Sequence, residues 1–322
     1  MPIILPQGLP AADRLRQEGL AVLTRDEANR EPLQIALVNL MPDRPTTETQ
    51  FARLLAGTEH PVELTLAIPN SHNPKTTPHD YLATFYRRWT EIAARRFDGL
   101  IVTGAPVEHL PFEEVHYWPE LCRIFDWARA AIPGSYHVCW AAQAALRHFH
   151  GVRKHALPQK AFGVFPQRTI LRSSPLMRGL GETFPTPVSR HTEIRCAELP
   201  WSSGLLPLSA SPRSGLCLLE DRPNRTLCMF NHLEYDADTL QREYLRDRAA
   251  GLNVPVPVGY FPADAPDRVP QNTWRPAARI LFANWLDRIA SETRTARVAG
   301  STTALRGAQR FGVSRPSMGF GF

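Results

Sequence analysis

The amino-acid sequence predicts an α/β protein whose mostly parallel sheet carries helices on both faces. Apolar, β-branched runs alternate with segments of helical periodicity over the first 150 or so residues, and this alternation is typical of βαβ units. The run 97–106 ends in glycine and proline, which suits a buried parallel strand that opens into a loop. Ligands bind such sheets at the carboxyl ends of the strands, so functional residues are sought there.

The elements follow in order along the chain. Residues 1–30 hold scattered charges and read as an N-terminal arm laid on the core or on a partner. A proline-rich connector, 254–276, precedes the last helix. The predicted strands are 33–40, 62–68, 97–106, 134–140, 162–165, 216–219 and 227–232, and the predicted helices are 46–56, 81–96, 117–131, 141–146, 236–250 and 276–289.

A single domain is expected over residues 1–292, followed by a disordered basic tail over 293–322. The tail is dominated by Gly, Ser, Thr and Arg without periodicity. Five of the six net positive charges belong to its arginines, so the body is close to neutral and nucleic-acid binding is not expected. These arginines are Arg294, Arg297, Arg306, Arg310 and Arg315.

Compartment and metal content follow from what the sequence lacks. The N-terminus has no basic stretch followed by a long apolar run, and no segment approaches the roughly 18 apolar residues of a membrane span. We therefore expect a cytoplasmic protein without membrane contact. The five cysteines are widely spaced and form no C-x-x-C pair, so neither a disulfide framework nor a metal site is expected.

Cys139 is the candidate nucleophile. It ends the apolar run 134–140, and the strongly helix-forming segment 141–146 follows, so the thiol lies on a sharp strand-to-helix turn. A helix N-terminus favours the thiolate, and the backbone amide of Trp140 is placed to donate to an oxyanion. The competing interpretation is a buried structural cysteine, which is the commonest role of a free cysteine.

His232 and Glu234 are the candidate base and its orienting partner. His232 closes an apolar run, and Glu234 follows two residues later. Extended residues at i and i+2 point to the same side, so the carboxylate can orient the imidazole and favour its charged form. Taken alone, this pair is equally compatible with an ordinary polar strand end.

Seven stretches of the chain together resemble the homoserine O-acyltransferases of methionine biosynthesis. The match runs in the same order and nearly the same spacing from about residue 1 to about residue 290. The resemblance implies a class I glutamine-amidotransferase-like (flavodoxin-like) fold and a Cys-His-Glu triad. The stretches are LMP at 40–42, DGLIVTGAP at 98–106, YWP at 117–119, CWAAQAAL at 139–146, HLEYD at 232–236, YFP at 260–262 and NWL at 284–286.

The resemblance also assigns roles to single residues. Cys139 forms an acyl-thioester, His232 accepts the proton and Glu234 orients it, while Lys160, Ser189 and Arg246 bind the substrate. An arginine at the last position suits bidentate binding of an amino-acid carboxylate. The expected partners are acetyl-CoA, as co-substrate rather than cofactor, L-homoserine, and a second copy of the chain in a homodimer.

Glu108 predicts the acyl donor. In the family, glycine at this position goes with succinyl-CoA and glutamate with acetyl-CoA. A carboxylate fills space and repels the free carboxylate of a succinyl group, but leaves room for a methyl group. We therefore expect acetyl transfer through a ping-pong mechanism, with succinyl transfer as the second possibility.

Two rival functions and a second acceptor are compatible with the same residues. A glutamine amidotransferase or cysteine hydrolase on the same fold usually has glycines two residues to either side of the cysteine, where this chain has His137 and Ala141. An interaction protein that keeps the elbow as a relic is the second rival. Asn231 and Leu233 replace the family's usual glycine and proline around the base, so serine competes with homoserine as acceptor, since one methylene discriminates by only about 1–3 kcal/mol.

Overall fold

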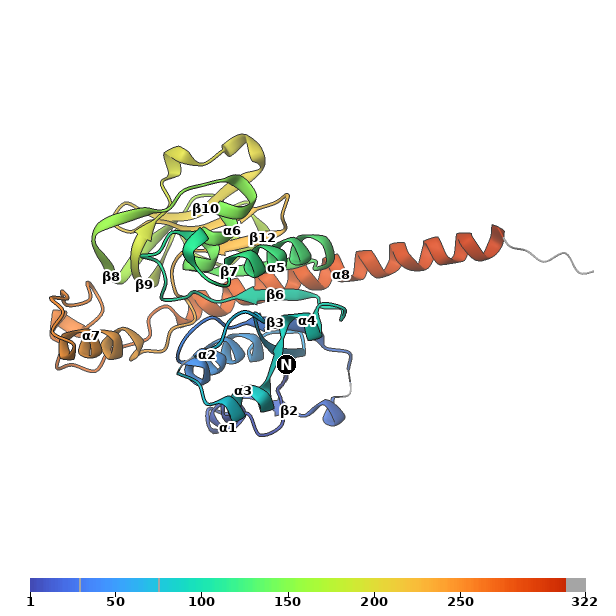
Figure 1. Ribbon diagram of the computed structural model, residues 1–322, viewed down its shortest axis with the longest axis horizontal. Coiled ribbons are helices and arrows are strands. Elements are labelled where there is room, and N and C mark those ends of the chain that lie inside the picture. Colours follow the sequence, from blue (N-terminus) through green and yellow to red (C-terminus); the bar gives the residue numbers. More distant parts are fainter. Residues whose placement is uncertain (29, 75, 311–322) are drawn as a thin grey trace, which may run out of the picture.

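A twelve-stranded sheet runs through the described part of the protein. The computed structural model describes residues 1–28, 30–74 and 76–310, with side chains through residue 295. One half of the sheet is parallel and carries helices on both faces, and the other half is antiparallel (Figure 1). The strand order is β2-β1-β4-β3-β6-β7-β12-β11-β10-β8-β9, and β5 pairs with β4.

The parallel half confirms the α/β prediction. Neighbouring strands from β2 to β12 in that order run in the same direction, and Cys139 follows β7 directly. The strands are β1 (Ile3–Ile4), β2 (Val22–Leu23), β3 (Leu33–Val38), β4 (Val62–Ile68), β6 (Gly99–Val102), β7 (Gly134–Val138) and β12 (Thr226–Met229), with β5 (Tyr86–Arg88) beside β4.

Alternate side chains of these strands enter two different cores. Ile35 and Leu37 of β3 pack with α2 and α8, whereas Ala36 and Val38 pack with α4, α5 and α6. Both faces are therefore buried, which explains why the strands read as continuous apolar runs. The helices are α1 (Pro10–Gln17), α2 (Arg44–Ala56), α3 (His79–Phe85), α4 (Trp89–Ile92), α5 (Trp118–Ala131), α6 (Trp140–His150), α7 (Thr239–Ala249) and α8 (Arg275–Arg310).

The prediction of one helix over 81–96 is wrong. The chain instead forms α3, the short strand β5 and then α4. Tyr86 is buried where β5 joins the sheet, and its hydroxyl donates to the buried carboxylate of Glu48. This tertiary pairing outweighs a local helical pattern.

The antiparallel half is larger than the sequence indicates. The predicted strand at 162–165 is the middle of the fifteen-residue β8 (His155–Thr169). β8 pairs with β9 (Thr183–Glu193), and β10 (Leu205–Ser211) follows beside β8. β11 (Gly215–Asp221) then joins this half to β12. β9 contains Pro185 and Pro187, which obscured it in the sequence, and as an edge strand it tolerates the missing N–H donors.

The two ends of the chain differ from the sequence expectation in detail. In the N-terminal arm, β1 and β2 extend the sheet, and α1 contributes Leu15 to the core. α8 was expected to end at 289 but continues to Arg310. Thr293 is buried and its hydroxyl donates to Asp98, so the folded body includes the first residue assigned to the tail. Residues 311–322 of the expected tail lie outside the described residues.

Within the described residues, no helix is both long enough and apolar enough to cross a membrane. Single turns of 3-10 helix connect several elements at Arg25–Glu27, Phe112–Glu114, Pro175–Met177, Cys196–Glu198, Trp201–Ser203 and Pro262–Asp264.

Candidate active site

Cys139 lies on a sharp turn between β7 and α6. Its backbone has φ 52° and ψ −116°, a positive-φ conformation that side-chain-bearing residues rarely adopt. Its amide donates to the carbonyl oxygen of Met229 at 2.6 Å, which fixes the turn against the neighbouring strand β12. The side chain is partly exposed, whereas those of Cys217 and Cys228 are buried. The turn therefore presents the thiol at the carboxyl edge of the sheet.

The space above the thiol is bounded by the loop that follows β6. A side chain at Gly104 would place its Cβ 3.3 Å from Cys139 Cβ and 4.0 Å from Cys139 Sγ. Trp140 is the first residue of α6, where backbone N–H groups have no acceptor within the helix. The absence of a side chain at Gly104 thus leaves room beside the sulfur, next to an amide suited to an oxyanion.

His232 and Glu234 meet although both lie in the loop after β12 rather than in the strand. Nδ1 of His232 is 2.7 Å from Oε1 of Glu234, and both side chains are buried. The imidazole also hydrogen-bonds to the thiol of Cys139. Cysteine, histidine and glutamate thus form one continuous chain of contacts, as the sequence predicts.

The charge balance favours a protonated imidazole. Burial by itself lowers the pKa of His232, but the Glu234 carboxylate and the neighbouring Cys139 sulfur more than offset it. The pKa of His232 therefore lies well above its ordinary value. A protonated histidine beside the sulfur stabilises a thiolate.

Tyr235 supports the imidazole, a contact that the sequence analysis missed. Its ring stacks on that of His232 with centroids 4.2 Å apart and an angle of 16° between the planes. The Tyr235 carbonyl oxygen accepts hydrogen bonds from Trp274 Nε1 at 2.9 Å and Asn272 Nδ2 at 3.2 Å. The residue adjoins the His-x-Glu stretch, but stacking depends on a turn that no local pattern predicts.

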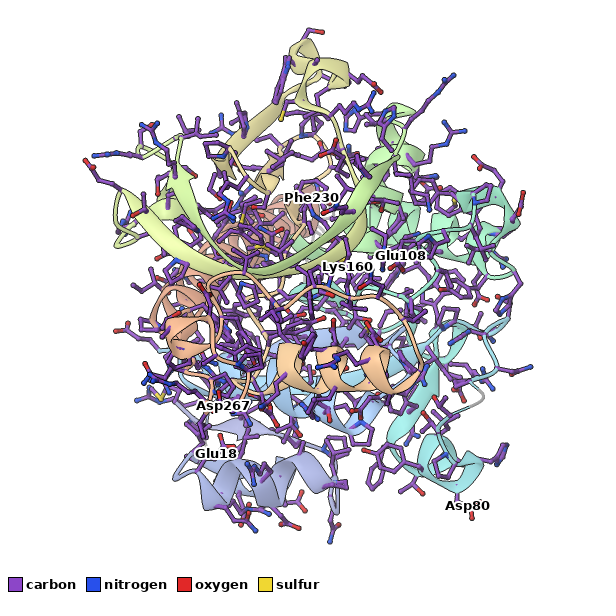
Figure 2. The ribbon with its side chains drawn as sticks, turned by 90° about the vertical axis from the view of Figure 1, so that its left-hand side faces the viewer. Glu18, Asp80, Glu108, Lys160, Phe230 and Asp267 are labelled. Carbon is purple, nitrogen blue, oxygen red and sulfur yellow. The ribbon has the colours of Figure 1, made fainter. Side chains whose placement is uncertain are left out.

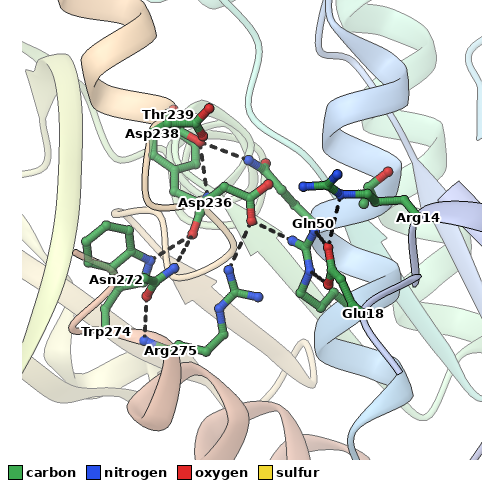
Figure 3. A network of polar contacts seen from close by, with 12 residues as sticks. Arg14, Glu18, Gln50, Asp236, Asp238, Thr239, Asn272, Trp274 and Arg275 are labelled. Atoms are coloured by element: carbon green, nitrogen blue, oxygen red, sulfur yellow. Dashed lines mark hydrogen bonds and ion pairs between the residues drawn. The ribbon is translucent and has the colours of Figure 1, made fainter. Parts of the chain in front are cut away.

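A network of ion pairs holds the next residue, Asp236 (Figure 3). Its Oδ1 lies 2.5 Å from Arg53 Nη1 and 3.0 Å from Arg275 Nη2. Arg53 also pairs with Glu18 at 2.5 Å. The N-terminal segment, α2 and α8 are thereby linked to the loop that carries the histidine and glutamate. A cavity of about 850 Å³ lies along this network.

Lys160 and Ser189 come together on one cluster of α7 side chains. Ser189 Oγ donates to Glu243 Oε2 at 2.5 Å, and Lys160 Nζ lies 3.4 Å from the same oxygen and 3.3 Å from Asp247 Oδ2. Tyr235 donates to the other oxygen of Glu243 at 3.0 Å, so the cluster reaches the imidazole. Figure 2 shows Lys160 between the β8–β9 ribbon and α7.

Arg246 occupies the outer side of this cluster. Its side chain is 69% exposed, and its guanidinium pairs with Asp247 Oδ1 at 2.7 Å. It is therefore linked to Lys160 only through Asp247. Glu243 and Asp247 were not singled out in the sequence, because two acids on a charged helix resemble an ordinary solvated face.

Arg190 is a second buried cation near the nucleophile. It neighbours Ser189 on β9, is 3% exposed, and donates to the carbonyl oxygen of Ser214. Burial lowers its pKa, while the nearby Cys139 acts in the opposite direction. A buried positive charge at this distance favours negative charge on the sulfur.

Glu108 lies beside two histidines in the loop after β6. Glu108, His109 and His191 each offer a ligand atom, and these atoms lie within 4.8 Å of one another. This is the group in the described residues that could hold a cation. The charges of Glu108 and Lys160 both act on His191, so the loop and the Lys160 cluster adjoin it from two sides, and Figure 2 shows both residues in the same region.

Asn231 and Leu233, the two departures around the base, are fully buried. Leu233 belongs to the main hydrophobic core, and the intervening His232 amide donates to Pro187 O at 2.9 Å. Both residues therefore support the loop from beneath and do not line an exposed surface.

Solved structures with the same fold are glutamine amidotransferases. The chain is similar to a GMP synthase protein from Thermoplasma acidophilum, with a TM-score of 0.54 and 14% identity, over 84% of this chain and 100% of that one. A glutamine amidotransferase from Thermotoga maritima gives a TM-score of 0.50 at 9% identity, over 81% and 99% of the two chains. The class I glutamine-amidotransferase-like fold is thus confirmed, and identities this low bear on the fold alone.

Sequence relatives identify the family. The homoserine O-succinyltransferase family model matches residues 2–295. Over 296 residues the chain is 52% identical to a homoserine O-acetyltransferase of Rhizorhabdus wittichii and 49% identical to one of Hyphomonas neptunium, covering 91% of this chain and 92% and 97% of theirs. The chain belongs to this family of homoserine O-acyltransferases and is an acyl-transferring enzyme.

Proposed function

We propose that the protein transfers an acetyl group from acetyl-CoA to the hydroxyl of L-homoserine through a thioester on Cys139. The observation that carries the proposal is the continuous contact from Cys139 to His232 and Glu234 at a helix N-terminus. A nucleophile, a base and an orienting carboxylate in that order are the arrangement that acyl transfer requires. The acetyltransferase names of the relatives support the choice of substrates.

In the first half-reaction, His232 takes the Cys139 proton, and the sulfur attacks the thioester carbonyl of the donor. The N-terminal amide of α6 at Trp140 stabilises the resulting oxyanion, and the space beside Gly104 receives the acyl group. Collapse of the intermediate breaks the carbon–sulfur bond to coenzyme A, and the departing thiolate receives the proton from His232. The acetyl group then remains on Cys139.

In the second half-reaction, His232 deprotonates the acceptor hydroxyl, which attacks the enzyme thioester. The cluster on α7 suits an amino-acid acceptor, because Glu243 and Asp247 can bind an ammonium group while Lys160 and Arg246 can bind a carboxylate. Ser189 lies within the same cluster and contributes a hydroxyl. Return of the proton to the Cys139 sulfur completes the cycle.

Mass spectrometry of the intact protein tests the thioester. We expect acetyl-CoA to add one acetyl group to the wild type and none to Cys139→Ala, and L-homoserine to remove it. Faster removal by serine would replace homoserine as the acceptor. Ammonia release from glutamine without any acyl adduct would favour an amidotransferase and reject the proposal.

Glu108→Gly tests the donor. Removing the carboxylate should shift the ratio of kcat/KM values from acetyl-CoA toward succinyl-CoA by at least tenfold, because about 1.4 kcal/mol of repulsion corresponds to that factor. Glu114→Gly in the same loop is the matched control, since Glu114 is exposed in the adjoining turn. An unchanged donor ratio in Glu108→Gly would rule out a role for this carboxylate in donor choice.

A further inference from the structure

A pocket of about 430 Å³ opens beside Glu108 and is lined by three cations, Arg147, Arg153 and Lys154. We infer that this pocket, called here the cationic pocket, binds the phosphate groups of the acyl donor's nucleotide end. The inference rests on the proposed function, in which the donor is an acyl-CoA. A coenzyme A thioester carries a diphosphate and a 3′-phosphate far from the reacting carbonyl, so the protein needs a separate site for them.

Two walls of the cationic pocket connect directly to the nucleophile. Glu108 belongs to the loop whose Gly104 touches Cys139. On the other wall, Thr192 donates to Gln143 Oε1 at 2.9 Å and accepts from Gln143 Nε2 at 3.2 Å, one turn of α6 beyond Cys139. A donor whose carbonyl lies at Cys139 therefore passes Glu108 as its chain enters the pocket.

The three cations differ in how far they are already neutralised. Arg147 pairs with Glu113 at 2.7 Å. Lys154 Nζ donates to the carbonyl oxygens of Glu108 and Leu110, both at 2.6 Å, which leaves the third of its N–H groups for a ligand. Its partial burial lowers the lysine pKa, as expected for an ammonium group withdrawn from water.

Arg153 is the cation available for an anion. Its side chain is exposed, and no carboxylate lies within 4.0 Å of it in the part of the chain that the structure describes. The guanidinium fork matches a phosphate with two parallel hydrogen bonds. The pocket volume lies within the roughly 300–1,000 Å³ of small-molecule sites.

Binding of desulfo-CoA by isothermal titration calorimetry tests the inference without any acyl transfer. We expect Arg153→Glu to raise the Kd for desulfo-CoA roughly 10- to 100-fold, since charge-assisted hydrogen bonds are lost and a repulsive charge is added. Arg168→Glu is the matched control, because Arg168 is an exposed arginine at the opposite end of β8 and should leave this Kd unchanged. Arg147→Gln provides a second variant, expected to act in the same direction.

The nucleotide specificity of the effect decides the outcome. The wild type should bind desulfo-CoA more tightly than pantetheine, which lacks the phosphates, and Arg153→Glu should abolish that preference. A Kd for desulfo-CoA within twofold of the wild type in both variants would overturn the inference, as would equal weakening of desulfo-CoA and pantetheine. Because no acetyl group is transferred, loss of desulfo-CoA binding in Arg153→Glu supports the pocket even if the acetyltransferase proposal fails.

Discussion

At the scale of single residues, the site depends on a backbone conformation that its nucleophile disfavours. Cys139 has positive φ, and such conformations in non-glycine residues cost about 1–3 kcal/mol. The hydrogen bond to Met229 and the helix that begins at Trp140 hold the turn in place. The strain is the physical consequence of presenting a side chain at the tip of a strand-to-helix turn.

Replacing Cys139 by glycine separates this strain from chemistry. Cys139→Gly and Cys139→Ala should both lose acyl transfer, but the glycine variant should have a free energy of unfolding about 1 kcal/mol higher than the alanine variant, since glycine adopts positive φ without strain. Urea denaturation of the two variants measures the difference. Equal stabilities would mean that the turn is not strained.

Glu234 governs the protonation of His232. In Glu234→Gln the offsetting charge is lost and burial dominates, so the pKa of His232 should fall. NMR titration of the imidazole measures this shift, and kcat should fall roughly 10²- to 10⁴-fold at neutral pH. Tyr260→Phe, which alters a hydroxyl bonded to Ala237 and Gln241 rather than to the triad, is the control and should leave the His232 titration unchanged.

At the scale of elements, the long β8–β9 hairpin delivers Lys160 and Ser189 to α7. The proline-rich connector fastens to this hairpin, because Val164 N donates to Val258 O at 2.8 Å and Val258 N donates to Phe162 O at 3.0 Å. Gly163 lies between these bonds with φ 143°. The connector thus passes so close to β8 that only glycine fits.

Gly163→Ala should therefore destabilise the protein. The added Cβ would lie 2.3 Å from Val258 O and 2.5 Å from Val258 N, so backbone must move, at a cost of about 1–3 kcal/mol or more. Chemical denaturation measures the loss. Gly57→Ala, with no atom within 4 Å of the new Cβ, is the control and should change stability by less than about 1 kcal/mol. Similar stabilities of the two variants would contradict the close approach.

At the scale of the whole molecule, buried histidines couple folding to pH. Burial lowers the pKa of His137, in the central strand β7, to about 3. Between pH 6.5 and 3 the unfolded chain therefore binds a proton that the folded protein does not, and stability falls as the pH falls. His137 contributes fully above about pH 6.5, and below it the loss approaches about 1.4 kcal/mol per pH unit.

Comparison of His137→Leu with His79→Leu tests this linkage. The first variant should show a weaker fall in the free energy of unfolding between about pH 7 and 5, measured by urea denaturation, because the coupled proton is removed. His79 is exposed on α3, so its replacement should leave the pH dependence as in the wild type. An unaltered slope in His137→Leu would assign the acid sensitivity to other groups.

Much of this organisation follows from local sequence patterns. The parallel strands, the elbow at Cys139 and the His232–Glu234 pair could be predicted because each depends on neighbouring residues: apolar runs, a strand followed by a helix former, and two polar groups two positions apart. The seven stretches that resemble the family extended this to Lys160, Ser189 and Arg246. The lone helix predicted over 81–96 failed because β5 pairs with a distant strand.

Only the tertiary structure decided how these parts meet. Glu243 and Asp247 join Lys160 across more than 80 positions of sequence, and Tyr235 stacks on His232 because Trp274 and Asn272 hold its carbonyl. The sequence by itself determined the elements, the nucleophile and its base. The surroundings of the reacting atoms depend on contacts between segments far apart in the chain, which local periodicity does not record.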